Sequence, residues 1–217
     1  MSARFDLALL PSAPDLSFEQ AFWAAGVGRV GGIDEAGRGP LAGPVAAGVV
    51  ILPPHPEIMA RLAGVRDSKQ MTPAQRESAC GRIREAALGY AVGFAEAPEI
   101  DVLGILPATR LAAVRALQAL ELAPEHLLLD YLFLPEVELP QTALIKGDCR
   151  SLSVAAASVL AKTARDARLV EMEQEYPGYS FARHKGYGTA AHRAALQRLG
   201  PCPEHRRSFH SKALPGL

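Results

Sequence analysis

Short apolar runs alternate along the chain with charged, glycine-rich or proline-rich stretches, and each run has a length typical of a strand. The clearest is Val45–Leu52, which is almost continuously apolar and is closed by two prolines, as expected for a buried strand. Four more runs predict strands near residues 30–33, 90–94, 127–130 and 143–145. None approaches the roughly 18–20 apolar residues that a membrane-spanning helix needs.

Between these runs, apolar residues recur at helical spacing. Thr72 followed by Pro73 is a typical helix start, and the helical pattern extends towards residue 87. A second helix is expected to open at Pro107, and the longest to run from residue 154 to about residue 175, alanine-rich and then amphipathic. Strands that come early, with helices interleaved and following, predict the α/β class with a mixed sheet covered by helices.

The composition fits one folded domain. The 217 residues are 49% hydrophobic and 21% charged, and a domain typically has about 100–200 residues. The N-terminus lacks a basic region followed by an apolar core, so no signal peptide is expected. The three cysteines are far apart and odd in number, which argues against a disulfide framework. These features together favour a cytoplasmic protein.

Charge is distributed unevenly, although 23 basic and 23 acidic side chains balance overall. Residues 95–140 hold eight acids and two bases, whereas residues 179–217 hold seven bases and one acid. The basic segment also contains Tyr179, Phe181 and Tyr187. It suits a polyanion, because lysine and arginine displace counterions from phosphates. A solvated basic helix followed by a polar tail explains the same charges, so charge alone leaves nucleic-acid binding open.

Three acids stand at the ends of predicted strands. Asp34 and Glu35 follow the apolar run at 30–33 and precede a glycine-rich turn, and Asp130 ends the run at 127–130. Adjacent strand residues face opposite sides of a sheet, but a glycine-rich turn can bring both acids to one place. Each acid alone is equally well explained as a turn former or a helix cap. Two strands that end in acids match the place where open α/β sheets put their chemistry.

A polar stripe runs along the longest predicted helix, where Ser158, Lys162 and Asp166 recur every four residues. A surface Lys162–Asp166 ion pair, worth about 0.2–0.5 kcal/mol, is one explanation. The alternative is that the stripe faces the strand ends and adds Asp166 to the acids there. Four converging carboxylates would repel one another by about 4 kcal/mol for each pair at about 4 Å, so they ionise at neutral pH only beside cations.

Carboxylate oxygens are hard ligands that favour Mg²⁺ or Mn²⁺ over zinc. Two such ions about 3.5–4 Å apart suit in-line displacement at a phosphodiester. The acids and the basic aromatic segment therefore indicate a nuclease. The rival hypothesis is a non-catalytic nucleic-acid-binding domain in which the acids are caps. A metal titration separates the two, because a simple binder has no Mg²⁺ or Mn²⁺ site.

Two glycine-containing motifs are less specific. Gly37-Arg38-Gly39 offers backbone N–H groups to a ligand without interference from a Cβ atom, but such turns are often purely structural. Lys146-Gly147-Asp148 follows a predicted strand and precedes the longest helix. Its Asp148 fits either a turn or cap residue or an acid at the periphery of a site.

The C-terminal cysteine and histidines do not predict a metal centre. Cys202, His205 and His210 fall short of the ligand set of a closed zinc site. Ser208 lies between the two histidines, but the elbow motif of a serine hydrolase is missing.

The string Gly32-Ile-Asp-Glu-Ala-Gly-Arg-Gly-Pro closely resembles the opening motif of the ribonuclease HII family. The resemblance continues in order through residues 67–70, 129–130, 146–148, 155–158, 161–162, 165–166, 184–187 and 205–209. It covers about residues 28–210, and the ordered series of motifs is highly specific. The family implies a ribonuclease H-like α/β fold. Residues 1–27 would be a helical lead-in, and residues 28–217 the catalytic domain, with a small basic helical extension from about residue 176.

The resemblance also implies an activity. Members of the family hydrolyse RNA in RNA·DNA hybrids and cleave on the 5′ side of ribonucleotides embedded in duplex DNA. The products would carry 5′-phosphate and 3′-hydroxyl ends. The enzyme would be a monomer that uses two Mn²⁺ or Mg²⁺ ions.

The family's site residues carry over to this sequence by position. The metal ligands and catalytic acids would be Asp34, Glu35, Asp130 and Asp166. The substrate contacts would be Gly37, Arg38, Gly39, Lys69, Lys162, Lys185 and Tyr187. Backbone groups of the glycine turn would sense the 2′-hydroxyl, the tyrosine would stack on the sugar of the neighbouring deoxynucleotide, and the lysines would contact phosphates.

Two positions depart from the family's pattern. Tyr131 follows Asp130 where many relatives have glycine, and Gly104 replaces an asparagine often seen before the helix at 107. Neither belongs to the predicted acids. We expect Tyr131 to narrow the strand end and Gly104 to loosen a turn.

Overall fold

The computed structural model describes residues 10–209, in which five strands form one mixed sheet. In spatial order the strands are β3 (Gly89–Ala95), β2 (Val45–Ile51), β1 (Val30–Ala36), β4 (His126–Asp130) and β5 (Gln141–Leu144). β2 is antiparallel to both β1 and β3, whereas β1, β4 and β5 run parallel to one another. The carboxyl ends of the three parallel strands therefore meet at one edge of the sheet.

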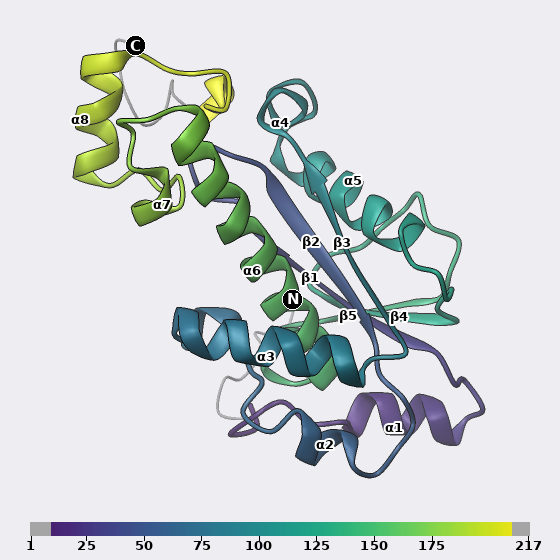
Figure 1. Cartoon of the computed structure of the whole chain (residues 1–217). Coiled ribbons are helices and arrows are strands. Elements are labelled where there is room, and N and C mark those ends of the chain that lie inside the picture. The colour runs from purple at the N-terminus through teal and green to yellow at the C-terminus, as the bar shows by residue number, and fades with distance from the viewer. Residues whose placement is uncertain (1–9, 210–217) are drawn as a thin grey trace.

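Helices cover both faces of this sheet (Figure 1), which confirms the predicted α/β architecture. The α-helices are α1 (Ser17–Ala24), α2 (Ile58–Arg61), α3 (Pro73–Ala86), α4 (Ala97–Leu103), α5 (Ile105–Gln118), α6 (Leu152–Glu175), α7 (Phe181–His184) and α8 (Ala190–Leu199). Two short 3₁₀ helices are η2 (Ser68–Gln70) and η3 (Gly147–Cys149). No helix within residues 10–209 is long and apolar enough to cross a membrane.

Alternating residues of β2 contribute to two separate cores. Val50 packs with side chains of α3 and α6, among them Ile83 and Leu160. Val49 faces the other way and packs with α5, where Ala112 is fully buried. The uniformly apolar sequence of β2 follows from this, because a strand covered on both faces has no solvated side.

β1 extends further than its apolar pattern predicts. The pattern places the end of the strand before Asp34, but β1 continues through Asp34 and Glu35 because both pair with β2. The parallel ladder with β4, in contrast, stops where Ile33 faces Leu129. The two acids are therefore paired with residues of β2 but with no residue of β4.

The segment between β3 and α5 also differs from the prediction. Residues 97–103 form α4, for which no helix was predicted, and α5 starts at Ile105 rather than at Pro107. Pro107 remains in the first turn, where a backbone N–H has no helical partner to lose. Gly104 joins the two helices with φ of +82°, a conformation that favours glycine.

The described part of the N-terminal lead-in is fastened to the start of α6. Its helix α1 packs Phe22 and Trp23 against the core. The buried carboxylate of Glu19 accepts hydrogen bonds from Ser151 Oγ at 2.6 Å and from the backbone N–H of Ser153 at 2.9 Å. Helix α1 is thus attached to the domain by apolar packing and by these hydrogen bonds.

The C-terminal extension packs on the far end of α6, where α7 and α8 lie in Figure 1. Phe181 and Leu196 of these helices share a buried cluster with Leu169 of α6. The extension also pairs with the loop after β1, because Leu41 donates its backbone N–H to Gly186 and accepts one from Arg206, both at 2.8 Å. The fold therefore brings the C-terminal motifs beside the glycine turn.

Candidate active site

Four acids gather where β1 and β4 end, and we call them the acid group. Asp34 is only 3% exposed, and its pKa is raised well above its ordinary value by burial and then by the charges of Glu35, Asp130 and Asp148. Burial raises the pKa of Asp130, and the charge of Glu35 adds to this effect. Burial and the charge of Asp130 likewise raise the pKa of Asp148. In Asp34, Asp130 and Asp148, burial and the charge of neighbouring carboxylates therefore both disfavour the ionised form.

Neighbouring strands and one short helix supply the acid group. Asp34 and Glu35 lie on β1, and Asp130 is the last residue of β4. Asp148 lies in η3, which follows β5. Asp130 Oδ1 accepts a hydrogen bond from the backbone N–H of Gly147 at 2.8 Å, and this bond holds η3 against the end of β4.

Asp166 is placed differently from the other predicted ligands. Its Oδ1 lies 2.6 Å from Nζ of Lys162, and its Oδ2 lies 3.2 Å from Nη2 of Arg76. Two cations therefore neutralise the Asp166 carboxylate. The polar stripe on α6 does reach the site through Lys162, which lines a cavity together with Glu35.

Asp148 is the candidate to which the sequence gave less weight. It follows β5 much as Asp130 ends β4, so an acid after a parallel strand was the available signal. The signal is weak, because a single acid after a strand is also a common turn or cap residue. Only the sheet order, with β5 beside β4, shows that Asp148 comes close to Asp34 and Asp130.

A cavity of about 300 Å³ opens beside the acid group, and we call it the glycine-turn cavity. It is lined by Glu35, Ala36, Gly37, Arg38, Gly39, Ser68, Lys69, Lys162 and Tyr187. All the predicted substrate contacts except Lys185 are among these residues. The lining residues thus come from segments up to about 150 residues apart in the sequence, and Glu35 of the acid group is among them.

The two glycines of the turn differ in what they require. Gly37 has φ of +95°, and a Cβ atom there would lie 2.0 Å from Nε of Arg165. At Gly39 a Cβ atom would meet only the ring of Tyr187, at an ordinary contact distance of 3.9 Å. Gly37 is therefore needed for the fold of the turn, whereas Gly39 keeps the space beside the backbone open.

Two buried arginines hold the backbone of this turn. Arg206 donates to the carbonyl oxygens of Gly37 at 2.6 Å and of Arg38 at 3.0 Å. Arg165 donates from Nε to the carbonyl of Pro44 at 2.8 Å. Burial lowers the pKa of Arg165 to about 10 and that of Arg206 to about 9, so both stay charged at neutral pH. Their hydrogen bonds fix the turn from the side of the C-terminal extension and of α6.

Tyr187 presents its ring to the glycine-turn cavity. Its backbone N–H donates to the carbonyl of His184 at 3.0 Å, and its carbonyl lies 2.9 Å from Nδ1 of His192. The backbone is thus fixed while the residue remains 46% exposed. An aromatic ring in this position can stack on a flat ligand group.

A second cavity, of about 610 Å³, adjoins the first at Lys162. Its charged lining residues are Arg76, Arg84, Lys162, Arg183 and Lys185, with Glu77 and Asp166. The lining has more bases than acids, and it includes the one predicted contact that the glycine-turn cavity lacks, Lys185. Nζ of Lys185 donates to the backbone carbonyl of Asp166 at 3.4 Å.

Lys69 extends from η2 towards the acids. Its Nζ lies 4.0 Å from Oδ1 of Asp67, and its side chain is 72% exposed. Burial works against its charge, but the charges of Asp34, Asp67 and Asp148 outweigh burial and raise the pKa of Lys69. This lysine stays protonated beside the acid group.

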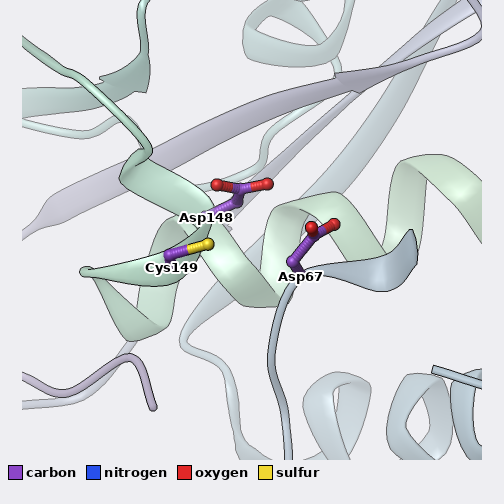
Figure 2. Close-up of side chains that lie close together, drawn as sticks. All are labelled: Asp67, Asp148 and Cys149. Atoms are coloured by element: carbon purple, nitrogen blue, oxygen red, sulfur yellow. The ribbon is translucent and has the colours of Figure 1, made fainter. Parts of the chain in front are cut away.

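Asp67, Asp148 and Cys149 form a second close group, whose side chains Figure 2 shows. Their ligand atoms lie within 4.8 Å of one another, and within residues 10–209 no other set of three acids, cysteines or histidines does so. Burial, followed by the charge of Asp148, raises the pKa of the Cys149 thiol to about 11. The group therefore adjoins the acid group and shares Asp148 with it.

The acid group has the donors that a divalent cation needs. Oε2 of Glu35 and Oδ1 of Asp148 are buried and have no hydrogen-bond partner within the described residues. Buried carboxylate oxygens without partners are costly unless a cation binds them. Carboxylate donors suit hard ions such as Mg²⁺ and Mn²⁺, so these residues fit such an ion.

The remaining motifs belong to the packing of the extension. His205 lies 3.1 Å from the sulfur of Cys202 through Nδ1 and 3.0 Å from His192 through Nε2, while His210 lies outside the described residues. Ser208 donates its hydroxyl to Asp101 at 2.6 Å. These contacts join the C-terminal segment to itself and to α4.

Tyr131, one of the two departures, does not narrow the strand end. It has φ of +53° and is 78% exposed, and its backbone N–H donates to Leu144 at 2.9 Å. Its side chain therefore extends into solvent next to Asp130.

Comparisons with known proteins agree on one family. The family model described as Ribonuclease HII matches residues 31–212. A ribonuclease HII from Chloroflexus aurantiacus is 52% identical over 200 residues, which cover 90% of this chain and 93% of that protein. The ribonuclease H2 structure from Pyrococcus horikoshii OT3 superposes with a TM-score of 0.69 at 28% identity, covering 84% of this chain and 94% of that chain. Bst-RNase HIII in complex with Mn²⁺ shares the fold, with a TM-score of 0.57 at 19% identity, and covers 78% of this chain and 70% of that chain.

Proposed function

The chain belongs to the ribonuclease HII family and is a metal-dependent RNA endonuclease, and we propose that it acts on RNA·DNA hybrids and on ribonucleotides embedded in duplex DNA. The observation that best supports this substrate is the glycine-turn cavity, where Glu35 of the acid group meets Gly39 and Tyr187. At this place a phosphodiester and the ribose next to it can reach the acid group and the glycine turn at the same time. Cleavage on the 5′ side of the ribonucleotide leaves 5′-phosphate and 3′-hydroxyl ends.

The proposed ligands of the divalent cations are the acid group, with Asp148 in the place that the sequence assigned to Asp166. Two ions, Mn²⁺ or Mg²⁺, match the hard oxygen donors of Asp34, Glu35 and Asp130. When bound, such ions activate water for in-line attack and neutralise charge on the phosphate and the leaving oxygen. The acids themselves supply no nucleophile. Burial, together with the charges of neighbouring carboxylates, raises the pKa values of Asp34, Asp130 and Asp148, and this supports the assignment because a bound cation stabilises the charged carboxylates.

Recognition of the ribose falls to the glycine turn in this proposal. Backbone groups of residues 37–39 border the cavity, and the space beside Gly39 leaves them accessible to a 2′-hydroxyl. A site built to hydrogen-bond a hydroxyl rejects an analogue without it by about 10⁴-fold or more. The ring of Tyr187 faces the same cavity and stacks on the sugar of the neighbouring deoxynucleotide.

The lysines hold the sugar–phosphate backbone. Lys69 and Lys162 line the glycine-turn cavity. Lys185 lines the second cavity, of about 610 Å³, which adjoins it and which we call the basic cavity. A continuous path of positive charge suits a phosphate chain, because each contact releases counterions. Arg84 and Arg183 extend this path along the basic cavity.

We propose that residues 28–217 form one catalytic domain, that residues 1–27 are a lead-in, and that the enzyme is a cytoplasmic monomer. The alternative of a non-catalytic binding domain is set aside, because the chain belongs to a family of endonucleases.

The test is a duplex that contains a single ribonucleotide, compared with the same duplex made only of DNA. We expect one cut on the 5′ side of the ribonucleotide, dependent on Mn²⁺ or Mg²⁺ and abolished by a chelator. Product ends are read by their response to phosphatase and to ligase. Equal cleavage of both duplexes, or products with 3′-phosphate ends, would contradict the proposal.

A further inference from the structure

Two carboxylates and a thiol come together beside the acid group. Asp67 immediately precedes η2, and Asp148 and Cys149 belong to η3. Their ligand atoms lie within 4.8 Å of one another, and Figure 2 shows the three side chains close together on these two segments. We propose that Asp67, Asp148 and Cys149 form a second cation site, which takes a zinc-class divalent ion and thereby inhibits the enzyme.

The buried carboxylate of Asp148 has an unpaired oxygen, which can bind a cation here as well as one in the acid group. Asp148 is 3% exposed, and its Oδ1 has no hydrogen-bond partner within the described residues. Its side chain is hydrogen-bonded to that of Cys149. A buried carboxylate oxygen is costly unless it is paired, and a cation between Asp148 and its two neighbours supplies the missing partner.

A separate cavity leads to this cation site. It has a volume of about 130 Å³, and its lining includes Asp67, Gln70 and Cys149 together with Arg66 and residues 10–14. None of these residues lines the glycine-turn cavity, so an ion can reach the sulfur without crossing the proposed substrate path.

Lys69 and Gln70 are the groups that must move aside. Lys69 lies 4.0 Å from Asp67, but its side chain is largely exposed and can turn to solvent. Nε2 of Gln70 lies 4.0 Å from the sulfur of Cys149, a long and weak contact.

The donor set selects the ion. Mg²⁺ gains little from sulfur, whereas zinc, cobalt and cadmium bind thiolate together with carboxylate oxygen. Three protein ligands leave a fourth position of a tetrahedral ion to water. On binding, the S–H bond of Cys149 breaks, the proton passes to solvent, and the sulfur forms a bond to the metal without any change in oxidation state.

Sharing of Asp148 links this site to catalysis. An ion held by Cys149 and Asp67 draws Asp148 away from the acid group, so the enzyme loses a ligand for Mn²⁺ or Mg²⁺. This inhibition rests on the proposed catalytic place of Asp148, whereas binding of the ion rests only on the three side chains.

Binding is tested with Co²⁺ on the full-length protein, because a cobalt–thiolate bond gives a charge-transfer band in the near ultraviolet. We expect the band in the wild type and in Cys202→Ala, which removes another half-buried thiol, and its loss in Cys149→Ala. Cys149→Ser is the second variant, and melting curves of all variants establish that they fold. A band that persists in both Cys149 variants, or that depends on Cys202, would overturn the site.

Inhibition is tested separately by titrating Zn²⁺ into a cleavage assay at fixed Mn²⁺. Cys149→Ala should keep its activity without zinc and should need at least about tenfold more zinc for half-inhibition, since even indirect support of a metal is worth 10–100-fold in affinity. Equal sensitivity of wild type and Cys149→Ala would refute the inhibitory role. If the cobalt band is present but no inhibition occurs, the cation site stands and its inhibitory role fails, whereas the catalytic place of Asp148 is tested by Asp148→Asn.

Discussion

At the scale of single residues, the surroundings of Asp148 and Asp166 separate two acids that look alike in the sequence. Asp148 lies among carboxylates, whereas Asp166 is paired with Lys162 and Arg76. We expect Asp148→Asn to lower turnover by roughly 10²-fold or more, because it removes a metal ligand. Duplex binding should be kept or strengthened, since one negative charge facing a polyanion is lost. Single-turnover cleavage and gel shifts measure the two effects.

Asp166→Asn is the matched control for this prediction. It removes the same charge at a position where two cations already neutralise it, so we expect only a partial loss of turnover. A loss of turnover as large as that of Asp148→Asn would indicate that Asp166 is a metal ligand after all.

Alanine substitutions at the two glycines of the turn should have different effects, one on activity and one on stability. Gly39→Ala adds a methyl group that meets only Tyr187, so the melting temperature should hardly change. Cleavage at a single ribonucleotide should fall by roughly 10²-fold, as expected when a small displacement disturbs the reacting groups. Gly37→Ala should instead lower the melting temperature, because of its φ of +95° and the clash with Arg165. An unchanged specific activity in Gly39→Ala would show that this glycine serves only the turn.

Substitution of Tyr187 should slow the cleavage of two kinds of substrate to different extents. Tyr187→Ala removes a ring that lines the glycine-turn cavity, while the backbone stays held by His184 and His192. A stacking contact is worth about 1–3 kcal/mol, so cleavage at a lone ribonucleotide should fall roughly 5- to 150-fold. Cleavage within a continuous hybrid should fall less, because no deoxyribose follows the cut.

Tyr187→Phe serves as the control and should retain the stacking contact. If Tyr187→Ala slows both substrates equally, or if its melting temperature drops sharply, the tyrosine is a structural anchor rather than a sensor of the junction.

At the scale of elements, α4 is joined to α5 and β3 by one ion pair. Arg115 donates to both oxygens of Glu99, at 2.7 and 2.8 Å, and to the carbonyl of Phe94 at 2.8 Å. The hydrogen bond from Arg115 is the main reason that the pKa of Glu99 falls from 4.5 to about 2. A depressed carboxyl pKa stabilises the fold above the unfolded value and loses that effect as pH falls.

Acid unfolding should therefore depend on Glu99. Its contribution is fully present above about pH 4.5 and disappears as the pH falls towards 2. We expect Glu99→Gln to lower the urea midpoint at pH 6 and to approach the wild type as the pH is lowered to 3. A constant difference between the two proteins over this range would show that the pair has no part in pH-dependent stability.

The elements also show where sequence patterns were sufficient. The helix at residues 73–86 starts as predicted because Thr72 caps it through a local capping box with Gln75. The end of β1 was predicted too early, since Asp34 and Glu35 are kept in the strand by pairing with β2, a partner that local apolar pattern does not reveal. Residues 97–103 were missed as a helix, although Glu96 and Glu99 form a capping box there.

At the scale of the whole molecule, the acid group makes stability depend on divalent metal. Burial of Asp34, Asp130 and Asp148, together with the charges of neighbouring carboxylates, disfavours the folded state when no cation is bound. We expect Mn²⁺ at about 100 times its dissociation constant to raise the melting temperature by about 5–10 °C, as measured by calorimetry with a chelator as reference. Asp34→Asn should raise the melting temperature in the chelator and lose most of the response to Mn²⁺. A melting temperature of Asp34→Asn below that of the wild type in the chelator would contradict this account.

The sequence by itself determined the chemistry and the local elements of this protein. Its apolar periods predicted the strands and the long helix, and its ordered motifs indicated acids at 34, 35 and 130 with a glycine turn beside them. These features depend on neighbours within a few residues, where period and capping act.

Only the tertiary structure decided which acids meet. The order β3-β2-β1-β4-β5 sets β5 beside β4, and so brings Asp148 to Asp34 and Asp130. Packing of the C-terminal extension on the turn gives the buried Arg206 its carbonyl partners at Gly37 and Arg38. Spacing along the chain specifies the face of a helix or strand, but not which distant strand becomes its neighbour. The neighbouring strand in turn decides which carboxylates repel one another, which ion pairs form and which groups are buried.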